Sequence, residues 1–518
     1  MSQRTVKTDS YLKKASMGAT IVFIGLIISS FLGYLVRMMI VRFYGIDDYG
    51  LFSLGTAIVG IAIIVSMLGM QESITRFVSF HLGRKAPERA KSTVLSSMKV
   101  TIPMSIAAAA IVILLSYQIS FNFFNEPTLY PILWAFAVMI PLSVILTNII
   151  STLKGLHDMK HKVYSEDILK SFTTLVLVFL FFFLGSGIMG ILYAYMIGFV
   201  LSILLASFYL YRSFPAMFRG IRGIPFQREL MYFSWPLLLA AYAKMIVSWT
   251  DTIALGFFKT SYDVGLYNVA LPTAGLILIF LNSFRYIFVP VVSELFGKKD
   301  KENMRTVFNS VNKWLYYITF PAFLLMILFP DNIMIILFGS EAVGASVPFV
   351  ILSFGFFMFS VFSLSSTLLL IIGKTKTNMF ITILGSTTNL VLNILLIPTF
   401  GINGAAVSTS ISFVIISLLS ALYCYMHSGF FPVQKVFTKP MVAGTISVLA
   451  FYALLKFIIM NFTWPILILS FPPFIVLYTF LLFVMGGLDK NDLMILRSIE
   501  SRTGLRSNLL RRIIRRFI

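Results

Sequence analysis

Long apolar segments recur along almost the entire chain of 518 residues and constrain its fold more than any other feature. A helix needs roughly 20 mostly apolar residues to cross about 30 Å of hydrocarbon, and about fourteen segments meet this condition. They cover approximately residues 16–43, 49–71, 93–120, 128–152, 166–185, 188–211, 231–258, 264–293, 312–338, 345–372, 378–399, 403–427, 440–461 and 464–487. We therefore expect an all-α polytopic membrane protein.

The composition agrees with a chain that is dissolved in lipid. Hydrophobic residues make up 58% of the sequence and charged residues only 12%, with a mean hydropathy of +0.92. A soluble protein of this length carries far more charge. The first segment follows a basic leader, residues 1–15, and exceeds the apolar core of a secretory signal. It is expected to remain as a transmembrane helix.

The positions of Lys and Arg predict the orientation of the chain, because these residues accumulate in cytoplasmic loops. If both termini are cytoplasmic, the inner segments hold 35 of the 41 Lys and Arg residues. The net charge of +21 is then mostly an orientation signal, so no nucleic-acid partner is required. The outer loops are too short for a catalytic or receptor domain.

A short phrase occurs twice in the sequence. Phe43–Ala57 reads FYGIDDYGLFSLGTA, and Phe258–Pro272 reads FKTSYDVGLYNVALP. Two more landmarks repeat at an offset of 214 residues, namely Val78–Lys85 with Val292–Lys299 and Gly187–Gly190 with Gly401–Gly404. An even number of spans in each half makes the repeat parallel. The expected division is a leader (1–15), two six-helix lobes (16–215 and 228–430), an additional transmembrane hairpin (440–487) and a basic tail (488–518).

The repeated phrase has the pattern of an outer helix–turn–helix. Asp48 and Asp263 stand where a carboxylate can cap the start of the following helix. Gly50 and Gly265 permit close helix packing. We interpret the phrase as structural.

These phrases, together with GINGAAVSTS at Gly401–Ser410, resemble the polysaccharide-transporter branch of the multidrug/oligosaccharidyl-lipid/polysaccharide (MOP) exporter superfamily. The resemblance covers roughly residues 10–430, and fourteen-helix members share the two additional spans. It implies a flippase that exports a polyprenyl-pyrophosphate-linked sugar across a prokaryotic plasma membrane. Relatives carry the peptidoglycan lipid precursor, or small organic cations as drug exporters, and these two activities remain the alternatives.

Charged residues within a bilayer are costly and are therefore candidates for function. Arg37 in the first span and Asp251 in the seventh stand at nearly equal depth by the repeat. The resemblance implies that these two helices face each other across a central cavity. Arg37 and Asp251 are predicted to approach in one conformation and separate in another, or alternatively to form a static ion pair.

Further polar residues of the spans complete the predicted substrate site. Lys244 and Trp249 share the seventh span with Asp251, while Asn282 and Arg285 lie in the eighth. Three cations against one carboxylate make a cavity cationic, and guanidinium groups bind phosphate oxygens with two parallel hydrogen bonds. The pattern favours an anionic cargo over a cationic drug, although Arg285 also has the position of a residue that reaches the interface.

Asn389 and Asn393 stand one turn apart in the eleventh span. They are candidates for binding sugar hydroxyls, or for bonding to a neighbouring helix, which we favour. No nucleotide-binding motif is present, so the energy for transport must come from an ion gradient, the membrane potential or consumption of the cargo. Asp251 is the candidate site for coupling Na⁺ or H⁺.

Enzyme and metal chemistry are not indicated by the remaining residues. A glycan polymerase or ligase needs catalytic groups on sizeable outer loops, which this sequence does not offer. His157 and His161 have metal-ligand spacing but no clear third ligand, so neither a metal site nor a cofactor is predicted. The single cysteine, Cys424, lies inside the twelfth span and is expected to serve packing.

The tail alternates arginines with apolar residues at helical spacing. This pattern is typical of an amphipathic helix on anionic membrane lipids, and docking of a cytoplasmic glycosyltransferase is the alternative. We expect a monomer whose partners are membrane lipids and a lipid-linked glycan.

Overall fold

The computed structural model describes residues 25, 27–218, 228–432, 437–458 and 464–486, and it is helical throughout this part, with no strand assigned in these ranges. The predicted leader and the basic tail lie outside the described residues. The prediction of an all-α polytopic fold is confirmed.

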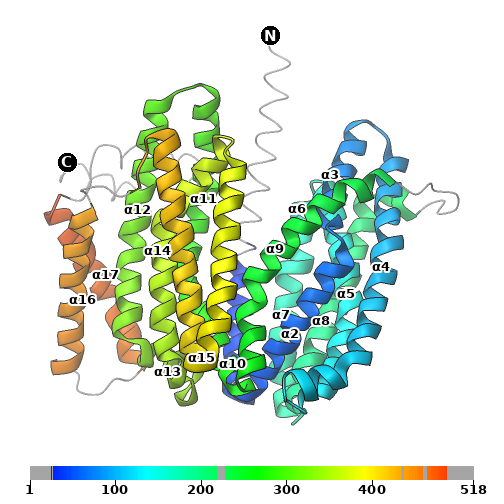
Figure 1. The fold of residues 1–518 in the computed structure, drawn as a ribbon, viewed down its shortest axis with the longest axis horizontal. Coiled ribbons are helices and arrows are strands. Elements are labelled where there is room, and N and C mark those ends of the chain that lie inside the picture. Colours follow the sequence, from blue (N-terminus) through cyan, green and yellow to red (C-terminus); the bar gives the residue numbers. More distant parts are fainter. Residues whose placement is uncertain (1–24, 26, 219–227, 433–436, 459–463, 487–518) are drawn as a thin grey trace. The chain divides into compact units, whose positions relative to one another are not determined.

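The helices of the first half, shown in Figure 1, correspond to most of the predicted spans. After the helix Ile27–Tyr44 they are α2 (Ile46–Met67), α3 (Met70–Gly83), α4 (Pro87–Tyr117), the π-helix η1 (Gln118–Phe123), α5 (Leu129–Gly155), α6 (Met159–Lys162), the π-helix η2 (Val163–Leu169), α7 (Lys170–Phe183) and α8 (Gly187–Ser213), with the 3₁₀ turn η3 (Pro215–Phe218) after them.

The second half repeats this order and adds a helical hairpin. Its elements are α9 (Arg228–Phe258), α10 (Ser261–Ala274), η4 (Gly275–Ile277), α11 (Leu278–Gly297), α12 (Lys301–Leu328), α13 (Pro330–Phe338), η5 (Ser340–Ala345), α14 (Ser346–Ile371), α15 (Thr375–Ser428), α16 (Thr438–Ile458) and α17 (Trp464–Val484). Helices α12, α14 and α15 run side by side, and α16 packs on α12.

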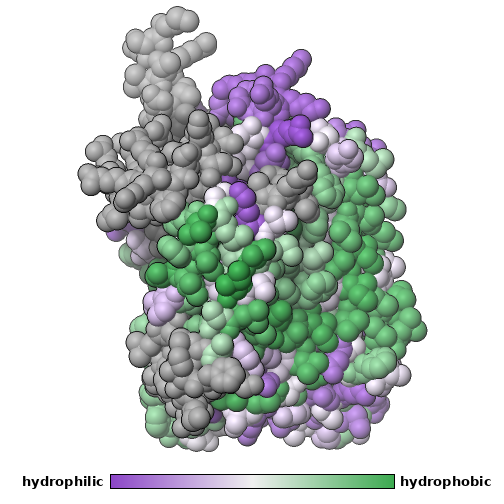
Figure 2. All heavy atoms as spheres, turned by 90° about the vertical axis from the view of Figure 1, so that its left-hand side faces the viewer, coloured by the Kyte–Doolittle hydropathy of each residue, from purple (hydrophilic) through white to green (hydrophobic). Residues whose placement is uncertain are grey.

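Within the described ranges, nine helices are long and apolar enough to cross a membrane. Figure 2 shows one face on which a broad hydrophobic region lies between hydrophilic side chains toward the top and bottom of the view. Exposed large hydrophobic side chains of the second half of the chain include Phe354, Ile394, Leu449 and Phe480. The count of fourteen crossings stays a prediction.

Backbone conformations at the turns show the same repeat as the sequence. Lys85 and Lys299, 214 residues apart, end their helices with φ of 56° and 57°. Gly187 and Gly401, at the same offset, have φ of 52° and 56°, and Gly401 divides α15 into the predicted eleventh and twelfth spans. A positive φ costs little free energy at a glycine, which has no Cβ atom. At the two lysines it occurs just after a helix, where the left-handed conformation commonly ends the helix.

Three predicted spans are broken helices rather than continuous ones. The second divides between α2 and α3, where Leu68 and Gly69 are both left-handed, with φ of 49° and 72°. The eighth passes into the 3₁₀ segment η4 three residues after Pro272, and the ninth ends at Leu328 before α13. Proline removes a backbone donor, and 3₁₀ stretches inside helices often mark hinges.

The chain forms two compact units, residues 1–268 and 269–518. The core of the first contains Met70, Ile150 and Leu230, and a core of the second contains Phe288 and Phe308. Helix α9 and the first turns of α10 therefore belong to the first unit, whereas the repeat groups them with the second lobe. The sequence repeat thus places the boundary between the halves before α9. The packing of α9 on α2 and α3 places the boundary between the compact units after Asn268.

His81, in the last turn of α3, is buried between aromatic rings in the first unit. Its side chain is 5% exposed, and the ring centroids of Phe77 and Phe80 lie 6.0 and 5.5 Å away. Its Nε2 atom has no hydrogen-bond partner in the described part of the chain. Burial, and next the positive charge of Arg89, lower the pKa of His81 below its usual value of 6.5.

This shift predicts a loss of stability in mild acid. The unfolded chain binds a proton at His81 more readily than the folded chain, so stability falls as pH drops from about 6.5 through the folded pKa. His81→Leu should flatten this slope in thermal unfolding of the detergent-solubilised chain between roughly pH 7 and 5. Leucine already occupies the equivalent position 295. Equal slopes in the variant and wild type would contradict the assignment, and His157→Leu, in an exposed loop, is the control.

Candidate functional site

Helix α9 is seated on α2 through glycines that leave room for its side chains. A Cβ atom on Gly60 of α2 would lie 3.1 Å from Nε1 of Trp249, so the indole packs directly on this glycine. A Cβ atom on Gly256 of α9 would overlap Leu54 of α2. The structure therefore gives Trp249, a predicted substrate residue, a packing contact on α2.

The other half of α9 is held by α3. The hydroxyl oxygens of Ser73 and Ser234 lie 2.7 Å apart, and the Arg76 guanidinium lies 4.0 Å from the centroid of Phe233. A Cβ on Gly69, at the break between α2 and α3, would come within 2.6 Å of the main chain of α9 at Ser234. Contacts along this length explain why α9 belongs to the first unit.

The two copies of the repeated phrase pack against each other inside the first unit. A Cβ on Gly50 would overlap the carbonyl oxygen of Ser261, and one on Gly265 would overlap that of Ile46. The start of α10 is also capped by Glu126, whose carboxylate accepts a hydrogen bond from the Ser261 amide at 3.0 Å. We call the contact of Gly50 with Ser261 and of Gly265 with Ile46 the glycine crossing. The predicted close packing at both glycines is present.

The capping prediction holds for one copy of the phrase only. Asp263 accepts hydrogen bonds from the Thr260 hydroxyl at 3.0 Å and its amide at 3.4 Å. Asp48 lies in the first turn of α2, but the N-terminus of this helix, at Gly45, has no side-chain cap.

Asp251 is buried at the contact between α9 and α10, with 5% of its surface exposed. The phenol of Tyr267 donates a hydrogen bond of 2.6 Å to its Oδ2 atom. One residue further along each helix, Thr252 and Asn268 bond through their side chains at 3.2 and 3.3 Å. Tyr49 of α2 donates to the main-chain oxygen of Asn268 at 3.1 Å. This polar cluster joins α2, α9 and α10.

Arg37 lies half-buried in the helix Ile27–Tyr44. Its charge acts on the phenol of Tyr195 in α8, which also interacts with Tyr49 of the polar cluster. Arg37 forms no hydrogen bond or ion pair with any residue that the structure describes. The alternative of a static Arg37–Asp251 ion pair is therefore not the arrangement in this structure, because Tyr267 bonds the carboxylate instead. The side chain of Lys244 lies outside the described residues.

Arg285 stands on α11 in the second unit. Its Nη2 atom donates to the Ser363 hydroxyl and, at 3.4 Å, to the Ser363 carbonyl oxygen on α14. Its Nε atom is buried without a partner among the described residues, and no carboxylate there pairs with this guanidinium. Asn282, one turn away, is exposed. The second unit thus holds a cation that its described carboxylates do not neutralise.

The asparagines of α15 bond to one another and to a neighbouring helical segment. Asn389 donates to the Thr409 hydroxyl at 3.1 Å, across the kink at Gly401, and Asn393 donates to Asn389 at 3.2 Å. Both are buried. This arrangement corresponds to the favoured helix-to-helix interpretation.

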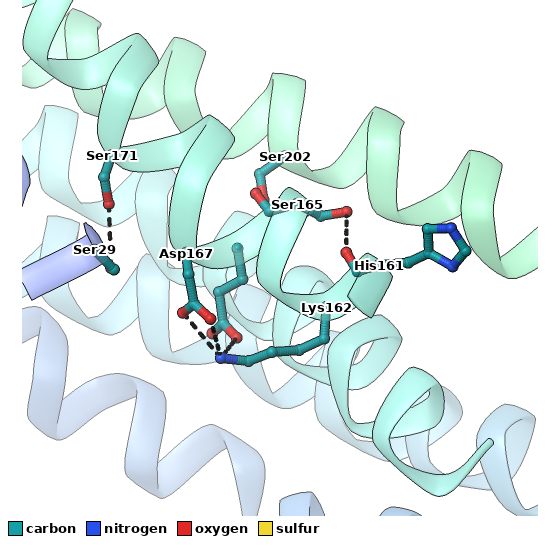
Figure 3. Close-up of polar contacts among 8 residues, drawn as sticks. Ser29, His161, Lys162, Ser165, Asp167, Ser171 and Ser202 are labelled. Carbon is teal, nitrogen blue, oxygen red and sulfur yellow. Dashed lines mark hydrogen bonds and ion pairs between the residues drawn. The ribbon is translucent and has the colours of Figure 1, made fainter. Parts of the chain in front are cut away.

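Sequence analysis missed an ionic cluster at the start of α7 (Figure 3). The Lys162 ammonium lies 2.6 and 2.9 Å from the two carboxylate oxygens of Asp167 and 3.3 Å from Glu166. Lys162 is 8% exposed and Asp167 7%. The π-helix η2 brings residues five apart together, and α8 covers it through Ser202, which donates to the Ser165 carbonyl at 2.8 Å.

The histidines of the adjacent loop are not arranged as metal ligands. His161 stacks on Tyr209 with centroids 4.0 Å apart, and its Nδ1 lies 2.7 Å from Asp158. Burial alone would raise the pKa of Asp158, but hydrogen bonds from His161 and Ser213 outweigh it and hold this pKa below its usual value. His157 is exposed. Among the described residues, no group of three potential ligands gathers around a metal position.

Comparison with solved structures supports the fold. The lipid II flippase MurJ in an inward closed conformation matches with a TM-score of 0.71 at 16% identity, over 92% of this chain and 100% of that one. An inward-facing multidrug resistance MATE family transporter of the MOP superfamily matches with a TM-score of 0.64 at 15% identity, over 79% and 98%. These similarities confirm the predicted architecture.

Two sequence relatives cover most of the chain. A probable low-salt glycan biosynthesis flippase, Agl15 of Haloferax volcanii, is 26% identical over 77% of this chain and 81% of its own length. An uncharacterized membrane protein of Methanocaldococcus jannaschii is 25% identical over 77% and 82%. The MatE family model matches residues 236–395. The model of the polysaccharide biosynthesis protein family matches residues 16–296, more than half of the chain. The chain therefore belongs to the polysaccharide biosynthesis protein family, as a multi-pass membrane protein with the fold of the MOP superfamily.

Proposed function

We propose that this protein is a flippase that moves a polyprenyl-(pyro)phosphate-linked oligosaccharide from the inner to the outer leaflet of a prokaryotic plasma membrane. Flippase relatives support transport rather than catalysis. The observation that carries the cargo class is Arg37, a half-buried guanidinium without an ion-pair partner in the described part. Because an unpaired charge in a membrane segment is costly, a bound phosphate group is the partner that we assign to it.

Arg285 supports the same assignment from the second unit. Its guanidinium bonds Ser363 and retains a buried Nε without a described partner. Each guanidinium group would repel an organic cation, whereas a phosphate would neutralise the group that it contacts. This argues against the drug-exporter alternative, and it leaves the peptidoglycan lipid precursor as a second candidate because that cargo also carries pyrophosphate.

Transport in this proposal follows alternating access, with the sugar head in the cavity and the polyprenyl tail in the bilayer. Asp251 is assigned the coupling cation, Na⁺ or H⁺, because it is a buried carboxylate within a membrane helix. We further propose cytoplasmic termini, a monomeric state and anchoring of the basic tail on membrane lipids, with docking of a glycosyltransferase at the tail as the alternative.

Cargo discrimination tests the proposal. The full chain in proteoliposomes is titrated with a polyprenyl-pyrophosphate sugar, with the peptidoglycan lipid precursor and with a hydrophobic organic cation, each at two salt concentrations. We expect the lipid-linked sugar to bind most tightly, and its affinity to fall at higher salt because the contact with phosphate is ionic. Binding of the organic cation alone would refute the proposed cargo and favour a drug exporter.

A further inference from the structure

Two consecutive polar contacts join α9 to α10 in the first unit. Tyr267 donates to Asp251, and Asn268 bonds Thr252. The two residues of each pair are 16 positions apart in the sequence, so the pairs are adjacent contacts between the same two helices. Tyr267 is fully buried. The phenol therefore holds one oxygen of the Asp251 carboxylate at a position that is closed to bulk water.

The position of Tyr267 depends on the glycine crossing. Tyr267 follows Gly265 by two residues, and Gly265 rests on the main chain of α2 at Ile46. The start of α10 is fixed again by the bond of Glu126 to the Ser261 amide. Because these contacts hold the first two turns of α10, a separation of the crossing would move the Tyr267 ring relative to α9.

The chemistry of a carboxylate makes such a movement consequential. Carboxylate oxygens bind protons and hard cations, and each oxygen offers a limited number of lone-pair sites. A phenol that donates at 2.6 Å occupies one of these sites on Oδ2. A cation that binds Asp251 through this oxygen must therefore compete with Tyr267.

We propose that Tyr267 is a positioning residue that couples the glycine crossing to cation binding at Asp251. While the crossing is closed, the phenol occupies the carboxylate and weakens cation binding. When the crossing opens, the phenol withdraws and no longer competes with the cation for Oδ2. This inference rests on the proposed function because it takes from it that the coupling cation binds at Asp251.

Other titratable or charged groups occur on α9 and α10 and on the helices that pack against them. They are Asp47, Asp48 and Tyr49 on α2, Glu72, Arg76 and His81 on α3, Glu88, Arg89, Lys91, Lys99 and Tyr117 on α4, Arg228, Glu229, Tyr232 and Tyr242 on α9, and Tyr262 and Asp263 on α10. Tyr49 reaches the cluster through the main chain of Asn268, and Asp263 caps its own helix. Tyr267 is therefore the group whose removal tests the contact with Asp251 directly.

Tyr267→Phe removes the hydroxyl and keeps the ring. In proteoliposomes that contain the full chain, transport is measured against Na⁺ at fixed pH and against pH at fixed Na⁺. For the cation that supports transport, we expect the half-maximal concentration to fall about tenfold, because a charged hydrogen bond no longer competes. Gly265→Ala should change it in the same direction, because the added Cβ overlaps the Ile46 carbonyl oxygen and opens the crossing.

A control variant separates positioning from a general loss of packing. Tyr478→Phe removes another buried hydroxyl, which donates to the Tyr317 carbonyl at 2.7 Å in the second unit, and should leave the cation dependence unchanged. An unchanged half-maximal concentration in Tyr267→Phe would overturn the inference, and so would an equal shift in Tyr478→Phe.

A measurement without cargo distinguishes this inference from the proposed function. The carboxylate stretching band of Asp251 is identified in infrared difference spectra as the band that Asp251→Asn removes. Tyr267→Phe should shift this band in the absence of any lipid-linked sugar, because the hydrogen bond is lost. A shifted band in a protein that does not bind the sugar would refute only the cargo, whereas an unshifted band would refute the role of Tyr267 whatever the cargo.

Discussion

Arg37→Ala is expected to weaken binding of a polyprenyl-pyrophosphate sugar by roughly tenfold to a hundredfold, since a charged hydrogen bond contributes about 1.5–3 kcal/mol. The same variant should abolish transport while the protein remains inserted and folded. The physical reason is that Arg37 has no ion-pair partner among the described residues, so its charge is available for the cargo. Binding is measured by titration into the full chain, and folding by thermal unfolding in detergent.

The conservative variant makes this test specific to phosphate. Arg37→Lys retains the charge but loses the planar fork that bonds two phosphate oxygens at once, so we expect it to recover only part of the affinity. Asp251→Ala should abolish transport through the coupling cation and leave sugar binding largely intact. His157→Ala, in an exposed loop, should change neither. Wild-type binding and transport in Arg37→Ala would refute the proposed phosphate contact.

Lys162→Met is expected to cost about 3–5 kcal/mol of unfolding free energy, because removal of one partner leaves a buried charge uncompensated. Two carboxylates, Asp167 and Glu166, lie within 3.3 Å of the ammonium. Burial alone lowers the pKa of Lys162, but these carboxylates outweigh it and raise this pKa, so the lysine is charged. Chemical unfolding of the detergent-solubilised chain measures the effect.

Lys298→Met provides the matched control for this prediction. Lys298 pairs with Glu294 at 2.6 Å, but both side chains are about two-thirds exposed, so loss of this pair should destabilise the fold far less than loss of the buried one. Adding Asp167→Asn to Lys162→Met should recover part of the stability, because it removes one of the uncompensated charges. If the two lysine variants are equally stable, the cluster on η2 is solvated and the buried geometry is incorrect.

Asp251 and Arg37 are candidates from the sequence alone, because a charge inside an apolar segment is visible there whatever surrounds it. Their partners were not predictable. Tyr267 has no feature that distinguishes it from other aromatic residues of the spans, and only the packing of α10 on α9 directs its hydroxyl to the carboxylate.

The cluster on η2 illustrates the same limit. Lys162, Glu166 and Asp167 look like a solvated charged loop, since consecutive charges near the end of a span usually face water. Their burial depends on the wide turn of a π-helix and on Ser202 of α8, which bonds the Ser165 carbonyl. An i, i+5 spacing of opposite charges is the one local signal that could have indicated this turn.

The sequence alone determined the all-α membrane fold and its internal repeat. Each of these follows from local properties: the length of apolar runs, the placement of Gly and Pro, and the recurrence of short phrases. Only the tertiary structure decided that the two copies of the repeated phrase pack on each other at Gly50 and Gly265, and that α9 belongs to the first unit. The physical reason is that these contacts join main-chain segments more than 200 residues apart. A glycine in the sequence indicates that a close approach is possible there, but it does not indicate which distant carbonyl oxygen approaches.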